Sequence, residues 1–85
     1  MNNKKKWFVY ILKCSDNSLY TGITVDLNRR VDEHNNSNKP AKYTRVRRPL
    51  KLIYFETCQD RSSASKRELE IKNMTKEKKL SLIDN

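Results

Sequence analysis

Residues that interrupt or cross-link a chain are scarce in this sequence of 85 residues, which contains one glycine, two prolines and two cysteines. Cys14 and Cys58 stand alone, without the spacing of a metal site or the density of a disulfide scaffold, so we interpret them as reduced, partly buried thiols. No apolar run approaches the length of a membrane span, and the opening segment 1–6 lacks the apolar stretch of a signal peptide. These absences argue against a disulfide-stapled, membrane-spanning or secreted protein, and they predict a cytoplasmic one.

Acidic residues are also fewer than basic ones. Ten Asp and Glu stand against 19 Lys and Arg, which gives a net charge of +9 and a pI near 9.8. A positive surplus of this size in one small domain predicts a polyanionic partner, with nucleic acid first. Charge alone leaves open two other classes: a non-catalytic nucleic-acid-binding module, and an interaction protein that meets an acidic protein partner. A hydrophobic content of 35% is low but compatible with a packed core, and we expect a monomer.

Hydrophobic periodicity and turn residues divide the chain into strands and helices. The expected elements are strands at 7–13 and 19–24, a helix from 26 that frays at 35–38, a basic loop, a strand at 50–56, a helix at about 62–73 and a last helix from 75. The fold class is therefore α/β in the α+β sense, with a small three-stranded, mostly antiparallel sheet flanked by helices. We expect a basic N-terminal tail at 1–6 and a single domain at 7–84. The only glycine, Gly22, lies near the end of the second strand and indicates close approach of another backbone or a ligand.

The helix from residue 26 carries a cation and a titratable ring beside its apolar stripe. Asp26 is the expected N-cap, because its carboxylate can accept from the free amides of the first turn. At 100° per residue, Arg30 and His34 flank the stripe one turn apart, whereas Arg29 points the opposite way. Both flanking side chains are therefore candidate functional residues. The alternative is a solvated helix whose polar residues only border the core.

The helix at 62–73 has a carboxylate on its apolar face. Glu68 falls between Ala64 and Ile71 on that face, whereas Glu70 points to water. A carboxylate on a buried face needs a cation, a hydrogen-bond donor or a metal ion as its partner. An internal salt bridge to an arginine and a metal site both remain open from this pattern.

A basic segment without any acidic residue runs from 35 to 55. Its six bases are interleaved with one tyrosine, Tyr43; the bases are Lys39, Lys42, Arg45, Arg47, Arg48 and Lys51. Pro40 and Pro49 bracket it, which leaves room only for a loop or a short helix. We expect this segment to grip a nucleic-acid backbone, with Tyr43 stacking on an unpaired base. The alternative is a solvated loop whose charge serves solubility.

Five motifs follow one another along the chain. Tyr10 ends the tripeptide at 8–10, and Tyr20 opens the tripeptide at 20–22, ten residues later. The other three are the run at 26–34, the segment 41–44 with 47–49, and the run at 64–72. In order and spacing these motifs resemble those of the GIY-YIG nuclease superfamily. The run at 26–34 is similar to its arginine-and-histidine helix, and 64–72 is similar to the helix that carries its metal-binding glutamate. Residues 41–44 with 47–49 resemble the segment of the short stand-alone bacterial members, the UPF0213 group.

The resemblance covers roughly residues 7 to 84 and includes departures from the family pattern. Phe8 replaces the first glycine and Thr21 the second isoleucine. Both are backbone or packing positions, so the chemistry survives. No residue is a clear equivalent of the asparagine that some larger members carry after the glutamate.

The resemblance implies an endonuclease-like, metal-dependent hydrolysis of phosphodiester bonds, with DNA as the expected substrate, in repair or processing. Arg30 would clamp the phosphate, and Glu68 would hold one Mg²⁺ or Mn²⁺ ion. Tyr10 would be the base for the attacking water, with its pKa lowered by Arg30, the metal and the neighbouring His34. Tyr20 would orient water or phosphate through its hydroxyl. The alternatives are a binding module with a degenerate site, and specificity supplied by a protein partner.

A shared site requires both tyrosines on one face of the sheet. Opposed residues of an antiparallel pair share a face, so their numbers must have an even sum and the intervening loop an odd length. The sequence therefore predicts a loop such as Ser15-Asp16-Asn17. A two-residue turn at Asp16-Asn17 would place Tyr10 and Tyr20 on opposite faces unless a bulge restored the parity.

Overall fold

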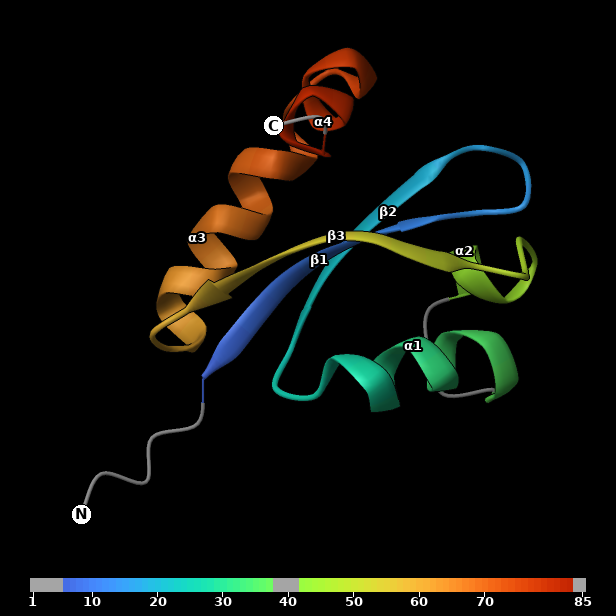
Figure 1. Cartoon of the computed structure of the whole chain (residues 1–85), viewed down its shortest axis with the longest axis horizontal. Coiled ribbons are helices and arrows are strands. Elements are labelled where there is room, and N and C mark those ends of the chain that lie inside the picture. The colour runs from blue at the N-terminus through green and yellow to red at the C-terminus, as the bar shows by residue number, and fades with distance from the viewer. Residues whose placement is uncertain (1–5, 38–41, 84–85) are drawn as a thin grey trace.

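The computed structural model describes residues 6–37 and 42–83, so most of the expected N-terminal tail, residue 84 and Lys39 lie outside the described part. The elements follow the predicted order (Figure 1): β1 (Trp7–Lys13), β2 (Leu19–Thr24), α1 (Leu27–Asn36), α2 (Lys42–Arg45), β3 (Lys51–Cys58), α3 (Arg61–Lys72) and α4 (Lys76–Ile83). Within the described residues, no helix combines the length and apolar character needed to cross a membrane.

The three strands form one antiparallel sheet in the order β2-β1-β3, which confirms the predicted fold class. The central strand β1 is buried on both faces. Val9 and Ile11 pack against α3, whereas Tyr10 and Leu12 point to the face that carries α1. Figure 1 shows α1 and α2 on the opposite side of the strands from α3 and α4. The core is thus two thin layers, one on each side of β1.

The hairpin between β1 and β2 has the predicted odd loop. Cys14 and Ser18 close the ladder with a 2.9 Å bond from the Cys14 N–H to the Ser18 carbonyl. The three residues between them form a turn in which Asn17 adopts a φ of 68° and donates its N–H to the Cys14 carbonyl at 3.0 Å. A turn followed by a left-handed residue is a usual three-residue hairpin loop. The register places Tyr10 opposite Gly22 and Leu12 opposite Tyr20, so the two tyrosines share a face.

Element ends differ from the predicted ones where distant segments meet. The helix α1 was expected to fray from Asn35, but it continues through Asn36. The Asn35 amide accepts from the Leu50 N–H at 2.7 Å and donates to the Leu50 carbonyl at 3.0 Å, which anchors the helix end. Strand β3 begins at residue 51 rather than 50 and continues to Cys58, because Cys58 pairs with Trp7 at the start of β1. Neither contact could be predicted from the local sequence, because each joins segments far apart along the chain.

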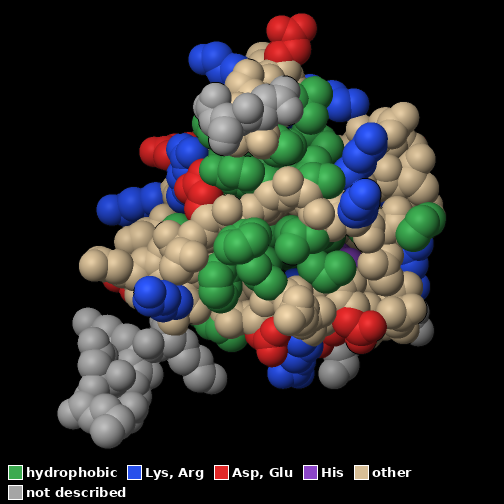
Figure 2. All heavy atoms as spheres, in the orientation of Figure 1, with side chains coloured by type: hydrophobic (Ala, Val, Ile, Leu, Met, Phe, Trp, Pro, Cys, Tyr) green, Lys and Arg blue, Asp and Glu red, His purple; other side chains and the backbone are tan. Residues whose placement is uncertain are grey.

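Side chains of one kind gather on one face of the molecule. Figure 2 shows hydrophobic side chains across the middle of that face, where the strands run, with Lys and Arg spread mostly around its rim. Phe55 on β3 is among the exposed large hydrophobic residues and packs edge-to-face on Phe8, with ring centroids 6.0 Å apart.

Gly22 lies directly beneath the side chain of Tyr10. A Cβ added at Gly22 would sit 2.5 Å from the Tyr10 hydroxyl oxygen and 2.7 Å from its Cζ. The expected close approach is therefore present, although a side chain makes it. We expect Gly22→Ala to displace the Tyr10 ring and to cost about 1–3 kcal/mol of stability, as overpacking does. Urea unfolding would measure this, with Ser65→Ala on the exposed face of α3 as control, and equal stabilities would contradict it.

Candidate active site

A chain of hydrogen bonds links three elements beneath the shared face of the hairpin. The Tyr10 hydroxyl lies 2.9 Å from Nε2 of His34, and Nδ1 of His34 lies 2.9 Å from the Thr44 hydroxyl. All three side chains are almost fully buried, and only a small part of the histidine is visible in Figure 2. His34 is thus held from β1 and from α2. Sequence reasoning missed Thr44, although it closes the run at 41–44 that resembles the stand-alone group.

The two titratable side chains in this row of hydrogen bonds, Tyr10 and His34, are both neutral near pH 7. Burial, reinforced by the charge of Arg30, lowers the pKa of His34 to about 4. Burial, reinforced by Tyr20, raises the pKa of Tyr10 to about 12. Arg30 lowers the pKa of Tyr10 as expected, but burial outweighs it, so the expectation of a lowered Tyr10 pKa is wrong for the protein alone. A neutral imidazole donates at one nitrogen and accepts at the other, so Tyr10 and Thr44 cannot both donate to it.

The depressed pKa of His34 predicts a loss of stability in mild acid. The unfolded chain binds a proton at His34 near pH 6.5, whereas the fold does so only near pH 4. The contribution of neutral His34 to the unfolding free energy is therefore fully present above pH 6.5 and is lost as the pH falls towards 4. We expect the unfolding free energy to be about 2 kcal/mol lower at about pH 5 than at about pH 7.5. Urea unfolding of wild type and His34→Gln would measure it, and an equal pH dependence in both proteins would contradict it.

Tyr20 connects the buried hydrogen bonds of His34 to the surface of the protein. Its ring centroid lies 5.1 Å from that of His34 in an edge-on arrangement and 6.2 Å from that of Tyr43, nearly parallel to it. The Arg47 guanidinium lies over the other ring of this stack, 3.8 Å from the Tyr43 centroid. An aromatic row thus runs from the core at His34 to the exposed Tyr43 on α2.

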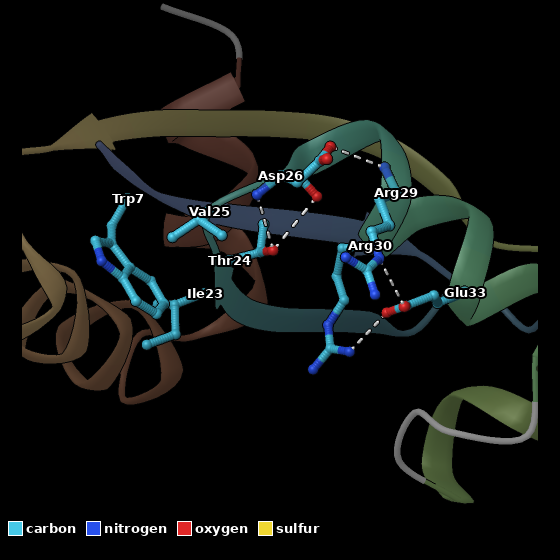
Figure 3. Close-up of a pocket in the computed structure, with 8 residues that line it drawn as sticks. All are labelled: Trp7, Ile23, Thr24, Val25, Asp26, Arg29, Arg30 and Glu33. Atoms are coloured by element: carbon cyan, nitrogen blue, oxygen red, sulfur yellow. Dashed lines mark hydrogen bonds and ion pairs between the residues drawn. The ribbon is translucent and has the colours of Figure 1, made fainter. Parts of the chain in front are cut away.

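Arg30 is positioned by an acidic neighbour that sequence reasoning missed. Its Nη1 donates to Glu33 at 2.9 Å, and Arg29 donates to the same carboxylate from Nε at 3.3 Å (Figure 3). The Arg30 side chain is 39% exposed, yet its Nε is buried without a hydrogen-bond partner in the described part of the chain. The charge of Arg30 also acts on Tyr10. A fixed guanidinium with a donor to spare suits a phosphate oxygen.

A pocket of about 300 Å³ opens beside Arg30 (Figure 3). It extends from the guanidinium side of α1 to the start of β1, and its wall changes from charged to apolar along the way. The lining residues are Trp7, Ile23, Thr24, Val25, Asp26, Arg29, Arg30 and Glu33. Asp26 accepts from the Arg29 N–H at 3.1 Å, which confirms it as the N-cap of α1.

Glu68 on α3 faces inward, as the helical wheel predicts. Its side chain is 22% exposed, against 64% for Glu70. The negative charge of Glu68 helps to raise the pKa of Tyr10, so the carboxylate acts on the same hydroxyl as Arg30. Its salt-bridge partner is Lys72 at 3.3 Å, one helical turn away, rather than an arginine. Arg67 of the same helix binds Glu70 and the β3 residue Glu56 instead.

Comparison with known proteins decides the family. The family model described as the GIY-YIG catalytic domain matches residues 6–81. The chain belongs to the GIY-YIG family. The UPF0213 protein DP2720 of Desulfotalea psychrophila is 54% identical over 81 residues, which cover 95% of this chain and 74% of that protein. The UPF0213 protein SERP0126 of Staphylococcus epidermidis is 56% identical over 78 residues, covering 92% of this chain and 94% of that protein.

Two solved structures share the fold of this GIY-YIG chain. The UPF0213 protein BH0048 of Bacillus halodurans matches with a TM-score of 0.59 and 40% identity, covering 93% of this chain and 83% of that one. The protein EF2693 of E. faecalis matches with a TM-score of 0.62 and 45% identity, covering 96% and 88%. GIY-YIG is a nuclease-type family, whereas the names of the UPF0213 relatives state no activity.

GIY-YIG nucleases generally depend on a divalent metal ion, and the donor set of this domain fits one. Within residues 6–37 and 42–83, no group of three or more His, Cys, Asp or Glu side chains is placed to hold a metal. The inward carboxylate of α3, Glu68, already pairs with the ammonium of Lys72. Mg²⁺ binds through one or two carboxylates and completes its shell with water and phosphate oxygens. One carboxylate therefore matches the small protein share of an Mg²⁺ shell and is unsuited to a structural zinc ion.

The basic segment of this GIY-YIG domain divides into two groups. Lys42, Arg45 and Lys51 are exposed, with Tyr43 between the first two. The other described bases are the adjacent pair at 47 and 48, which bind within the protein. Lys39 lies outside the described residues.

Arg47 and Arg48 stabilise the fold around the site. Arg47 donates from Nε to Asp16 at 3.0 Å and from Nη1 to the Tyr43 carbonyl at 3.1 Å, which joins the hairpin loop to α2. Arg48 donates from Nε to the His34 carbonyl at 2.6 Å and from Nη2 to that of Ser37, at the C-terminal end of α1. Their expected role in gripping nucleic acid therefore competes with these internal bonds.

Proposed function

We propose that this protein hydrolyses phosphodiester bonds of nucleic acid, with DNA as the substrate, as an endonuclease of DNA repair or processing. One divalent ion, Mg²⁺ or Mn²⁺, would be held by Glu68. A single observation carries the proposal: the Tyr10 hydroxyl, from β1, hydrogen-bonds His34 of α1 and feels the charges of Arg30 and of Glu68 on α3. Two helices far apart in sequence thus bring a proton acceptor, a cation and a carboxylate to one hydroxyl on β1.

Arg30 is the phosphate clamp in this proposal. Negative charge develops on the non-bridging oxygens during phosphoryl transfer, and a fixed guanidinium stabilises it without reorganising. Glu33 fixes the guanidinium from one side, and the buried Nε makes no hydrogen bond within the described part of the chain. When bound at Glu68, the metal ion would act as a Lewis acid on the phosphoryl oxygen. Tyr20, on the same face as Tyr10, would orient water or phosphate through its hydroxyl.

Tyr10 would act as a relay rather than as a standing phenolate. With its pKa at about 12, its hydroxyl carries a proton at neutral pH. It can accept a proton from the attacking water only as its own proton leaves, and Nε2 of His34 at 2.9 Å is the acceptor in contact. The negative charge then moves from water to the phosphate, and the positive charge forms on His34.

A cleavage assay tests the proposal. Labelled single-stranded, duplex and branched DNA would be incubated with the protein and Mg²⁺, Mn²⁺ or a chelator. We expect cuts that require metal and that an Arg30→Ala sample does not make. Binding without any metal-dependent cut would contradict nuclease activity.

The second candidate is a non-catalytic nucleic-acid-binding module. The Lys72 ammonium on Glu68 favours it, because an occupied carboxylate disfavours metal, and the net charge of +9 suits binding alone. Specificity would then come from a protein partner. The same assay separates the two candidates, since only the enzyme turns over.

The exposed bases of α2 should grip the nucleic-acid backbone. Reversing Lys42 and Arg45 to Glu should weaken binding across all sequences and lower the slope of log affinity against log salt by about 0.7 to 0.9 for each phosphate that is no longer neutralised. Binding titrations at several salt concentrations would measure this in chelator. These two residues are a cleaner test than Arg47 and Arg48, whose internal bonds would break on reversal.

Lys66 and Lys78, reversed in the same way on α3 and α4, provide the charge-matched comparison. An unchanged slope for the α2 pair together with a reduced one for this pair would place the basic face on the other side of the sheet.

A further inference from the structure

A hollow of about 360 Å³ opens at the outer edge of β2, where no further strand from residues 6–37 or 42–83 closes the sheet. Four elements contribute to its wall, and no acidic side chain is among the lining residues. These are Leu19, Tyr20, Thr21, Tyr43, Lys72 and Lys79. The hollow is distinct from the pocket beside Arg30, which has no lining residue in common with it.

A buried hydroxyl in this wall lacks a partner. Thr21 is only 3% exposed, and its Oγ1 makes no hydrogen bond within the described part of the chain. Leaving such a group unpaired costs free energy of about 1–3 kcal/mol, so an unpaired one calls for an explanation. Because the Cys14 N–H donates to the Ser18 carbonyl, the alternation along the ladder turns the Thr21 N–H away from β1. The Thr21 N–H therefore faces the open edge of β2, next to the unpaired hydroxyl of the same residue.

Two ammonium groups complete the donor set. Lys72 comes from α3 and the half-buried Lys79 from α4. Lysine ammoniums and a hydroxyl, with no carboxylate in the wall, select an anion with several acceptor oxygens. Tyr20 belongs both to this wall and to the candidate active site, where its ring lies 5.1 Å from that of His34. The hollow thus adjoins the site where Arg30 would hold the scissile phosphate.

We propose that this hollow binds a second phosphate group of the nucleic-acid strand, through Lys72, Lys79 and the Thr21 hydroxyl. The residues of the hollow are the argument that an anion binds there. That this anion belongs to a nucleic-acid strand rests on the proposed function. The strand then crosses the open edge of β2, from the exposed bases of α2 towards α3 and α4.

Lys72 serves two groups, which couples this subsite to Glu68. Its ammonium pairs with the Glu68 carboxylate at 3.3 Å and also lines the hollow. A cation bound at Glu68, or removal of its charge, releases Lys72 to the phosphate. Glu68→Gln should therefore raise nucleic-acid affinity, and adding Lys72→Gln should cancel the rise.

Binding in chelator tests the subsite without any cleavage, so its outcome is independent of whether the protein is a nuclease. The probe is a short single-stranded oligonucleotide, with inorganic phosphate as a second arm. Lys72→Gln with Lys79→Gln should weaken oligonucleotide binding severalfold and lower the salt slope by about 0.7, the value for one phosphate on a single strand. Lys66→Gln with Lys78→Gln removes the same charge from the same two helices and should leave the slope nearly unchanged.

Thr21→Val separates a ligand-binding hydroxyl from a structural one. Valine has nearly the same shape, so removing an unpaired hydroxyl should leave stability equal or higher, while oligonucleotide affinity falls. Inorganic phosphate should shift the amide NMR signal of Thr21 in wild type. The proposal is overturned if Thr21→Val binds as wild type does, if both lysine pairs lower the slope equally, or if wild type binds no oligonucleotide. A response to inorganic phosphate alone, without any to the oligonucleotide, overturns the nucleic-acid source.

Discussion

Replacing Glu68 by glutamine should abolish metal-dependent cleavage, with a rate loss of about a thousandfold or more, since a metal ion supplies several kcal/mol of transition-state stabilisation. The amide keeps the shape of the side chain but loses the negative charge that a divalent ion needs. Cleavage of the best substrate from the assay above would be followed under single-turnover conditions. Affinity for nucleic acid, measured in chelator, should stay near normal or rise.

Glu70→Gln is the matched control for this prediction. Glu70 lies two residues away on the same helix, is 64% exposed and pairs with Arg67, so its loss should leave turnover nearly unchanged. Mn²⁺ titration followed by electron paramagnetic resonance supplies a readout without turnover: binding should be weak without nucleic acid and absent in Glu68→Gln. Equal activity of Glu68→Gln and wild type would refute the assignment.

Arg30→Ala should lower the cleavage rate by about a hundredfold to a thousandfold, as the loss of one preorganised donor to a developing oxyanion does elsewhere. Arg30→Lys should recover little of it, because an ammonium lacks the planar fork that Glu33 holds in place. The measurement is the single-turnover rate at saturating protein, which separates chemistry from binding.

Arg29→Ala controls for the charge and for the shared carboxylate. Arg29 also pairs with Glu33 but is 72% exposed on the opposite side of α1 from the stripe, so its removal should change the rate little. Equal losses in Arg29→Ala and Arg30→Ala would show a general charge effect and contradict a specific clamp. Unfolding midpoints of both variants would show whether a loss of rate reflects a loss of fold.

Features governed by neighbours along the chain were predictable from the sequence. Strands β1 and β2 have the predicted bounds, because aromatic and β-branched residues with a turn between them suffice to define a hairpin. The requirement that Tyr10 and Tyr20 share a face predicted an odd loop such as 15–17, and the structure has that loop and that shared face. The N-cap of α1 and the inward direction of Glu68 followed from helical periodicity in the same way.

Features that depend on segments far apart were not predictable. The Thr44 contact to His34 joins two helices, and the internal bonds of Arg48 end at carbonyls of α1 and its cap. A run of Lys and Arg residues looks the same in a sequence whether the side chains reach solvent or bind a carbonyl of the protein. The sequence therefore identified the basic segment but did not show which of its residues are exposed and which bind internally.

The sequence by itself determined the order of the elements and the inward side of α3 on which Glu68 lies, because these follow from periods of two and 3.6 residues, and its motifs identified the family. Only the tertiary structure decided the protonation of Tyr10 and His34, because burial sets those pKa values and burial arises when α1 closes over the sheet. It also decided that Lys72 pairs with Glu68 while lining the hollow at the edge of β2. That hollow exists because β2, α2, α3 and α4 meet there, and no local pattern encodes such a meeting.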